Sequence, residues 1–242
     1  MKLTWLGQVG LAIQSGDSLL MTDPYLMDTL STASGPQFNR MVPVEEGWLG
    51  AWPDVIALTH DHGDHLDLPS LHCLVTEEKK VTLMGGENAW QKLRGKFPGS
   101  HNYVRMTPGT EWSTPDFHIR AIPACHSDST ALGYLIHAEG LPLCVTGDTL
   151  YQERILQAIG EPVDIVFVVM NGMGNNMNYL DAARYAAAVR ARVAIPVHWG
   201  LFEKFSDDPR LFAREAEALG VTAYIARIYE TLDAHRLLED KK

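Results

Sequence analysis

One polar stretch of seven residues organises the whole chain: Thr59-His60-Asp61-His62-Gly63-Asp64-His65. It directly follows the apolar run 55–58, Val-Ile-Ala-Leu, which predicts a buried strand that ends where the polar stretch begins. A loop at a strand end can turn several side chains toward one point. Imidazole and carboxylate ligands together suit borderline divalent ions such as zinc, manganese or iron. The stretch therefore favours a metal site over the alternative reading, a solvated polar turn.

Three later residues of ligand type follow other predicted strands: His126, Asp148 and His198. Each alone is a weak signal, because a lone histidine at a strand end is more often a hydrogen-bonded structural residue. Asp148 has an alternative role as the N-cap of a helix that begins near Tyr151. Together with the first stretch, however, the three residues complete the ligands that two ions need. We expect His60, His62 and His126 on a first ion, Asp64, His65 and His198 on a second, and Asp148 bridging both.

This set of motifs resembles the metallo-β-lactamase superfamily. Its signature His-x-His-x-Asp-His is matched at residues 60–65, and its later ligand positions are matched by His126, Asp148 and His198. The resemblance covers nearly the whole chain. It implies an α/β fold, an αββα four-layer sandwich with a dinuclear metal site at one edge of the two sheets. It also implies the ion-by-ion assignment given above.

A narrower resemblance is to the L-ascorbate-6-phosphate lactonase-like branch of that superfamily. It rests on short motifs that include Asp23-Pro24-Tyr25, residues 147–151 (Gly-Asp-Thr-Leu-Tyr) and residues 196–200 (Pro-Val-His-Trp-Gly). The lactonase itself has a longer chain, so its phosphorylated sugar-acid substrate is not carried over. The branch hints at manganese, whereas histidine-rich ligation suits zinc. Two divalent ions per chain, zinc or manganese, are the expected cofactors.

The rest of the chain predicts a single domain over residues 1–242. Strands joined by short turns are expected over residues 3–22, and the last third alternates helices with apolar strands before a polar tail. Residues 26–53 are poorly periodic and predict a long loop, which could close over a small ligand.

Composition limits the partners and the location. The net charge is -10 and no block of Lys or Arg follows the chain, so no nucleic-acid partner is expected. Three cysteines do not make a disulfide framework and favour a reducing compartment. No run approaches the roughly 18 apolar residues needed to span a membrane. We expect a cytoplasmic protein that acts on a small molecule, with a homo-oligomer allowed.

The expected chemistry is hydrolysis. Two cations would lower the pKa of a shared water toward about 7, and the resulting hydroxide would attack a carbonyl carbon or a phosphorus. Asp64 or Asp148 could pass a proton to the leaving group. Candidate substrate contacts are Tyr25, Asn171 and Asn178, with turn chemistry as the alternative for the asparagines.

These features predict a metal-dependent, lactonase- or esterase-like hydrolase of a small, polar or anionic metabolite. Lys204 or Arg210 could hold an anion at the rim, with ordinary surface charges as the alternative reading. A phosphodiesterase or nuclease that uses the same two-metal site is one alternative function. A non-catalytic metal-binding protein is the other.

Overall fold

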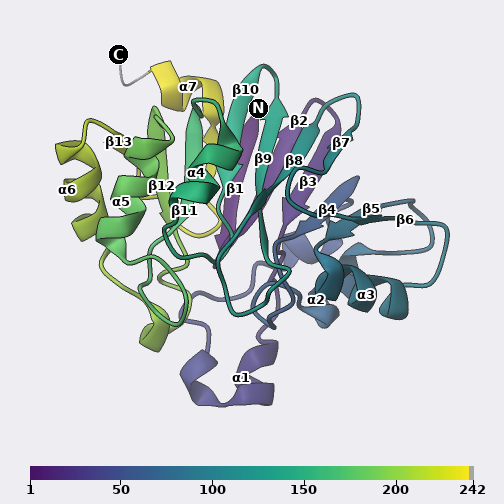
Figure 1. Ribbon diagram of the computed structural model, residues 1–242. Coiled ribbons are helices and arrows are strands. Elements are labelled where there is room, and N and C mark those ends of the chain that lie inside the picture. The colour runs from purple at the N-terminus through teal and green to yellow at the C-terminus, as the bar shows by residue number, and fades with distance from the viewer. Residues whose placement is uncertain (240–242) are drawn as a thin grey trace.

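Two seven-stranded sheets form the centre of the molecule in the computed structural model, which describes residues 1–239 (Figure 1). The first sheet has the order β14-β1-β2-β3-β4-β5-β6. From β14 to β3 the neighbours are antiparallel, and from β3 to β6 they are parallel. Its strands are β1 (Lys2–Gly7), β2 (Gly10–Ser15), β3 (Ser18–Thr22), β4 (Val55–Leu58), β5 (Thr82–Gly85), β6 (Asn102–Arg105) and β14 (Thr231–Asp233).

The second sheet has the order β13-β12-β11-β10-β9-β8-β7. From β7 to β10 the neighbouring strands are antiparallel, and from β10 to β13 they are parallel. Because β8 and β10 both run antiparallel to β9, the strands β8, β10 and β12 all end at the same edge. The strands are β7 (Glu111–Ser113), β8 (His118–Pro123), β9 (Leu132–Ala138), β10 (Leu141–Val145), β11 (Ile165–Val169), β12 (Val193–Val197) and β13 (Thr222–Ala223).

Helices cover the two outer faces and complete the αββα sandwich that the sequence predicts. The first sheet is covered by α2 (Leu68–Leu74) and α3 (Glu87–Lys96), which lie at the opposite side of Figure 1 from α5 and α6. The second sheet is covered by α4 (Glu153–Ile159), α5 (Tyr179–Ala188) and α6 (Pro209–Ala218). Within residues 1–239, none of the helices combines the length and apolar character needed to cross a bilayer.

Apolar side chains fill the three spaces between these layers. The central layer, between the sheets, includes Trp5, Tyr134 and Phe167, all at most 2% exposed. Burial of each large apolar side chain stabilises the fold by about 1.5–3 kcal/mol. The sandwich is thus held by its strands and helices, and the loops at the strand ends are free to carry polar groups.

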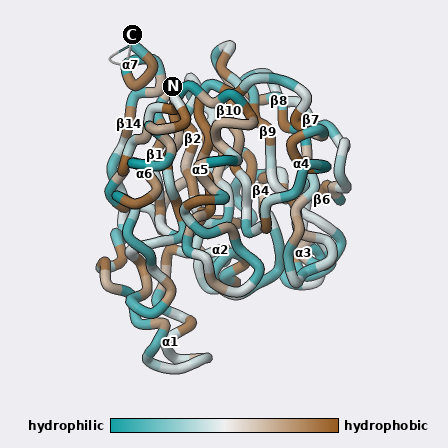
Figure 2. Tube along the Cα trace, turned by 60° about the vertical axis from the view of Figure 1, so that its left-hand side comes forward, coloured by the Kyte–Doolittle hydropathy of each residue, from teal (hydrophilic) through white to brown (hydrophobic). Residues whose placement is uncertain are grey.

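Residues 26–53 contain more structure than the predicted loop. They form α1 (Thr29–Ser34) and the 3₁₀ turns η1 (Pro36–Phe38) and η2 (Glu46–Gly50). No residue of α1 is buried, and α1 stands out from the body in both Figure 1 and Figure 2. The segment is nevertheless attached to the body, because Arg40 pairs with Phe202 and the Met41 N–H donates to the Leu201 carbonyl at 2.8 Å.

The C-terminal region also differs from the predicted polar tail. Residues 231–233 form β14, which pairs with β1, and α7 (Ala234–Glu239) places apolar side chains in the central layer. The last three residues of the predicted tail, 240–242, lie outside the described part. A three-residue strand whose partner lies 227 positions away leaves no periodic signal, so local patterns miss it.

Candidate metal centre

Four strand ends bring the predicted ligands together at one edge of the sandwich. The stretch 59–65 follows β4, His126 follows β8, Asp148 follows β10 and His198 follows β12. Seven positions spread over 139 residues of sequence thereby reach one small volume, as expected when the corresponding ends of strands lie at one edge.

Ligand atoms gather in two groups that match the expected ions, and in a third, overlapping group of Asp23, His60 and His65. The first group is His60, His62 and His126, and the second is Asp64, His65 and His198; the ligand atoms of each group lie within 4.8 Å of one another. In the first group, His126 Nε2 lies 3.2 Å from His62 Nδ1. These two groups are the ones that the sequence assigns to two separate ions.

Asp148 lies between the two groups. Its Oδ2 is 3.3 Å from His198 Nε2, 3.6 Å from His65 Nε2 and 3.9 Å from His126 Nε2. The preceding Gly147 has a left-handed φ of 61°, and a Cβ at that position would lie 2.6 Å from the Leu132 carbonyl oxygen. A glycine is therefore required there to present Asp148. The alternative helix-cap role is not realised, because α4 begins at Glu153 with Gln152 at its N-cap.

Unpartnered polar atoms inside the cluster show that the residues fit a metal. His60 Nε2, His65 Nε2 and Asp148 Oδ1 are buried and have no hydrogen-bond partner within residues 1–239. Buried polar atoms are nearly always satisfied, and an unsatisfied one costs about 1–3 kcal/mol. Divalent ions held by the two groups would satisfy these atoms through imidazole nitrogen and carboxylate oxygen, the donors that such ions bind.

The charges of the cluster also suit cations. Burial, assisted by the neighbouring His65, holds the pKa of His60 well below its ordinary 6.5, so this imidazole is neutral and free to bind a metal. Burial opposes the charged form of His198, but Asp148 and Asp64 outweigh it and raise its pKa to about 9. Burial likewise opposes ionisation of Asp148, yet His198 and His65 keep its pKa well below 3.8.

Asp23 supports the cluster from behind. Its Oδ2 lies 2.8 Å from His65 Nδ1, its Oδ1 accepts the Thr59 N–H at 2.7 Å, and the Thr59 hydroxyl also donates to it. These contacts make Asp23 an outer partner of the metal site and not merely a turn residue before Pro24. Such an outer carboxylate fixes the ring orientation of the histidine that binds the ion.

Gln8 is a further residue of the site that the sequence did not single out. Its Nε2 donates to Asp64 Oδ2 at 2.7 Å and lies 3.3 Å from His198 Nε2. Its carbonyl accepts the backbone N–H of His198 at 2.8 Å and the indole N–H of Trp5 at 2.9 Å. Its signals in the sequence were its position between two short strands and its place in residues 4–8, Thr-Trp-Leu-Gly-Gln, a further motif that resembles the lactonase-like branch.

The structure separates the three predicted substrate contacts. Asn171 lines the cavity, but its side-chain amide lies 2.9 Å from His198 Nδ1 and thereby orients that ring. Asn178 instead caps α5, where its side-chain oxygen accepts the Asp181 N–H at 3.0 Å. Tyr25 is fully buried, and its hydroxyl accepts the Leu30 N–H. Neither Asn178 nor Tyr25 lies on the cavity wall, because a helix cap and a packing role occupy them.

An open cavity of about 320 Å³ lies directly over the ligand cluster. Five of the seven predicted ligands form its floor: His62, Asp64, His126, Asp148 and His198. Lys204 and Arg210 are not among its lining residues. Arg210 is paired with Asp208 at 2.8 Å, so the reading of Arg210 as an ordinary surface charge fits better than a role in holding substrate.

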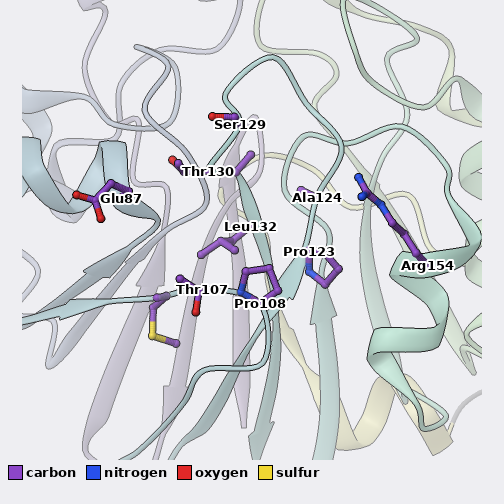
Figure 3. Close-up of a pocket in the computed structure, with 11 residues that line it drawn as sticks. Glu87, Thr107, Pro108, Pro123, Ala124, Ser129, Thr130, Leu132 and Arg154 are labelled. Carbon is purple, nitrogen blue, oxygen red and sulfur yellow. The ribbon is translucent and has the colours of Figure 1, made fainter.

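A second cavity, of about 290 Å³, lies beside the loop that carries His126 (Figure 3). Glu87 and Arg154 stand on its opposite sides, and Ser129 and Thr130 lie near its upper rim in that view. Its lining includes none of the seven predicted ligands. The cavity over the cluster is therefore the candidate active site.

The layered fold and the strand-end cluster together define the class of the protein, a chain of the metallo-β-lactamase fold with a candidate metal centre. A family model described as "Beta-lactamase superfamily domain" matches residues 23–199, and the chain belongs to that family.

Individual relatives agree with this placement. A UPF0173 metal-dependent hydrolase of Methanopyrus kandleri is 27% identical over 234 residues, covering 91% of this chain and 94% of the relative. Igni18, a metallo hydrolase from Ignicoccus hospitalis, has a similar fold with a TM-score of 0.76 at 21% identity, covering 96% and 97% of the two chains. The metallo-beta-lactamase fold protein YhfI from Bacillus subtilis gives 0.73 at 20% identity, covering 96% and 98%. Igni18 and YhfI are therefore similar to this chain in fold.

Proposed function

We propose that the protein opens a lactone or cleaves a carboxylic ester of a small molecule, with two divalent ions, zinc or manganese, held by the seven clustered residues. The observation that carries the proposal is the cavity whose floor is formed by five of these ligands, with Asp148 lying between the two groups. A small molecule that enters the cavity meets the cluster directly. The small molecule is polar or anionic in this proposal, and because no lysine or arginine of the described residues lines the cavity, an anionic group would be held by the ions at the floor.

The residues of the chain have separate roles in this proposal. His60, His62 and His126 would hold one ion and Asp64, His65 and His198 the other, and Asp148 lies within reach of both groups. The bound ions would supply a nucleophile from water at neutral pH and polarise the attacked oxygen. Asp64 is partly open to the cavity, with its side chain 21% exposed. Burial alone would raise its pKa, but His65 and His198 lower it, so Asp64 enters the reaction as a carboxylate that can accept a proton.

A panel of substrates on metal-loaded protein tests this function. Protein purified without chelator is assayed for bound metal, and then for turnover of γ-butyrolactone, benzyl acetate and bis-p-nitrophenyl phosphate. The expected result is turnover of the lactone or ester, which is lost in His126→Ala and unaffected in His72→Ala, a variant of an exposed histidine on α2. Turnover of the phosphodiester alone would refute the proposal in favour of the phosphodiesterase alternative. Stoichiometric metal without any turnover would favour a non-catalytic protein.

Three further expectations from the sequence stay predictions. They are the narrower relation to the lactonase-like branch, residence in the cytoplasm, and a small-molecule partner in place of nucleic acid. Fractionation of the native cells would test the location, and the substrate panel addresses the other two.

A further inference from the structure

Three phenylalanines form one wall of the cavity over the ligand cluster: Phe38, Phe202 and Phe205. The rings of Phe38 and Phe205 are stacked, with centroids 4.9 Å apart and planes inclined by 14°. Phe202 meets Phe38 edge to face at 5.6 Å. Phe202 is buried, whereas Phe38 and Phe205 keep part of their surface exposed. The aromatic wall, defined by these three residues, therefore presents apolar surface to whatever occupies the cavity.

The aromatic wall is held in place by two segments that are far apart in sequence. Phe38 ends η1, whereas Phe205 ends η3 (Glu203–Phe205), just after the ligand His198. The backbone bridge between Arg40 and Phe202 joins the two segments. The Arg40 guanidinium then donates to the Tyr25 carbonyl at 3.1 Å and to the Tyr229 hydroxyl at 2.7 Å. These bonds fix the wall before any ligand arrives, which lowers the entropic cost of binding.

The other surfaces of the cavity differ in chemistry from the aromatic wall. The floor is the ligand cluster, and the side formed by residues 173–176 offers Met173, Asn175 and Asn176. The Asn176 amide donates to Asp148 Oδ2 at 2.8 Å and is thus held toward the floor. A molecule that fits has a polar reacting group at the floor and an apolar group against the aromatic wall.

No lysine or arginine of the described residues stands at the aromatic wall to bind an anionic group on the substrate's ring. The Arg40 guanidinium is occupied by Tyr25, Val42 and Tyr229. The Lys204 ammonium lies 5.7 Å from the centre of the Phe205 ring and does not line the cavity. Stacked or edge-on aromatic contacts, in contrast, suit a flat ring and contribute about 0.5–1.5 kcal/mol beyond the area that they bury.

We infer that the site takes an ester or lactone that bears an uncharged aromatic ring, and that Phe38 and Phe205 hold this ring beside the ligand cluster. The ester or lactone part of this inference rests on the proposed function. The ring-binding part rests on the aromatic wall alone, and the experiment separates the two.

Two acetates of matched leaving groups test the preference for a ring. Benzyl acetate and cyclohexylmethyl acetate carry the same carbon skeleton and differ in aromaticity, and 4-carboxybenzyl acetate adds a negative charge. We expect kcat/KM for the benzyl ester to exceed that for the cyclohexylmethyl ester by about threefold to tenfold, the size of one aromatic contact. The charged ester is expected to be the poorest of the three. Equal rates for the first two, or a preference for the charged ester, would overturn the inference.

Phe38→Leu and Phe205→Leu locate the source of the preference, because leucine stays apolar but has no ring. In each variant the ratio of the two kcat/KM values is expected to fall to within about twofold of unity. Trp52→Ala is the matched control, since Trp52 is 57% exposed and lies outside the cavity lining. An unchanged ratio in both leucine variants would refute the role of the aromatic wall.

Binding of unreactive amides gives a result that does not depend on turnover. Saturation-transfer NMR with N-benzylacetamide and N-(cyclohexylmethyl)acetamide on the wild-type protein is expected to show tighter binding of the aromatic amide. If the protein hydrolyses no ester but still prefers the aromatic amide, the proposed function fails and the ring-binding inference stands. If neither amide is preferred, the ring-binding inference fails, whatever the hydrolysis assays show.

Discussion

Replacing Gln8 by alanine should weaken one of the two metal sites and leave the other intact. The side-chain amide donates to Asp64 Oδ2 at 2.7 Å and lies 3.3 Å from His198 Nε2, so it contacts two of the three residues assigned to the second ion. It contacts none of the three residues assigned to the first. The backbone bonds of Gln8 to His198 and Trp5 do not depend on its side chain and are retained in Gln8→Ala.

The expected size follows from the loss of one charge-assisted hydrogen bond to a metal ligand. Such a bond contributes about 1.5–3 kcal/mol, and loss of an outer partner of a ligand typically lowers metal affinity by about 10- to 100-fold. We expect a change of that size at one of the two steps of a calorimetric Zn²⁺ titration, with no change at the other step. The free energy of unfolding of the metal-free protein should change by less than about 1.5 kcal/mol.

Gln14→Ala is the matched control for this titration. Gln14 lies on the adjacent strand and also donates its amide, but to the Gly16 carbonyl at 2.8 Å on the surface. This variant should titrate like the wild type. Two unchanged binding steps in Gln8→Ala, or equal losses at both, would show that Gln8 does not position the second group of ligands.

Three further results are expected. Asp148→Ala should lower turnover by at least about 100-fold, because this carboxylate contacts both ligand groups. The variant should still be folded when measured by circular dichroism. Full metal content with normal turnover would contradict the bridging role. In metal-free protein the raised His198 pKa of about 9 stabilises the fold fully below about pH 6.5, and this contribution is lost as the pH rises through 9. The melting temperature should therefore fall over that window, whereas the Zn²⁺ affinity should rise because the proton and Zn²⁺ compete for the His198 imidazole. Proton release on Zn²⁺ binding is measurable by calorimetry in two buffers. An affinity that does not change with pH would refute this competition. Asp23→Ala should cost about 3–5 kcal/mol in urea unfolding, since it leaves His65 and Thr59 without their buried partner; a cost below about 1 kcal/mol would mean that Asp23 is only a turn former.

The αββα fold was expected from the family resemblance and is confirmed, and the clustering of the expected ligands follows from local signals. An apolar run that ends in a polar stretch marks a strand end, and the short His-x-His-x-Asp-His spacing leaves few other uses for its residues. His126, Asp148 and His198 could be added because each follows a strand of the same kind. The structure then brings these residues together, as strands that end at one edge must do.

Contacts between distant segments were harder to predict. The aromatic wall needs η1 and the segment after His198 to meet, and the pairing of Arg40 with Phe202 has no signature in either segment. Tyr25 and Asn178 were chosen for their place in motifs, but burial and helix capping decide where their side chains point. The local sequence pattern indicates which residues could contact a substrate, whereas tertiary packing determines which of their side chains line the cavity.

Backbone conformation gives an independent reason to treat Gln8, Asp23 and His198 as parts of one metal site. All three have left-handed φ angles, of 49°, 37° and 67°, although none is glycine. Such a conformation is uncommon for a non-glycine residue and persists where surrounding contacts determine it. Here the His198 N–H donates to the Gln8 carbonyl, and the Asp23 carboxylate contacts the ligand His65. The left-handed positions Gln8 and Asp23 thus contact the ligands Asp64 and His65, and the third is the ligand His198 itself; sequence alone does not reveal this shared strain, because it is visible only in φ.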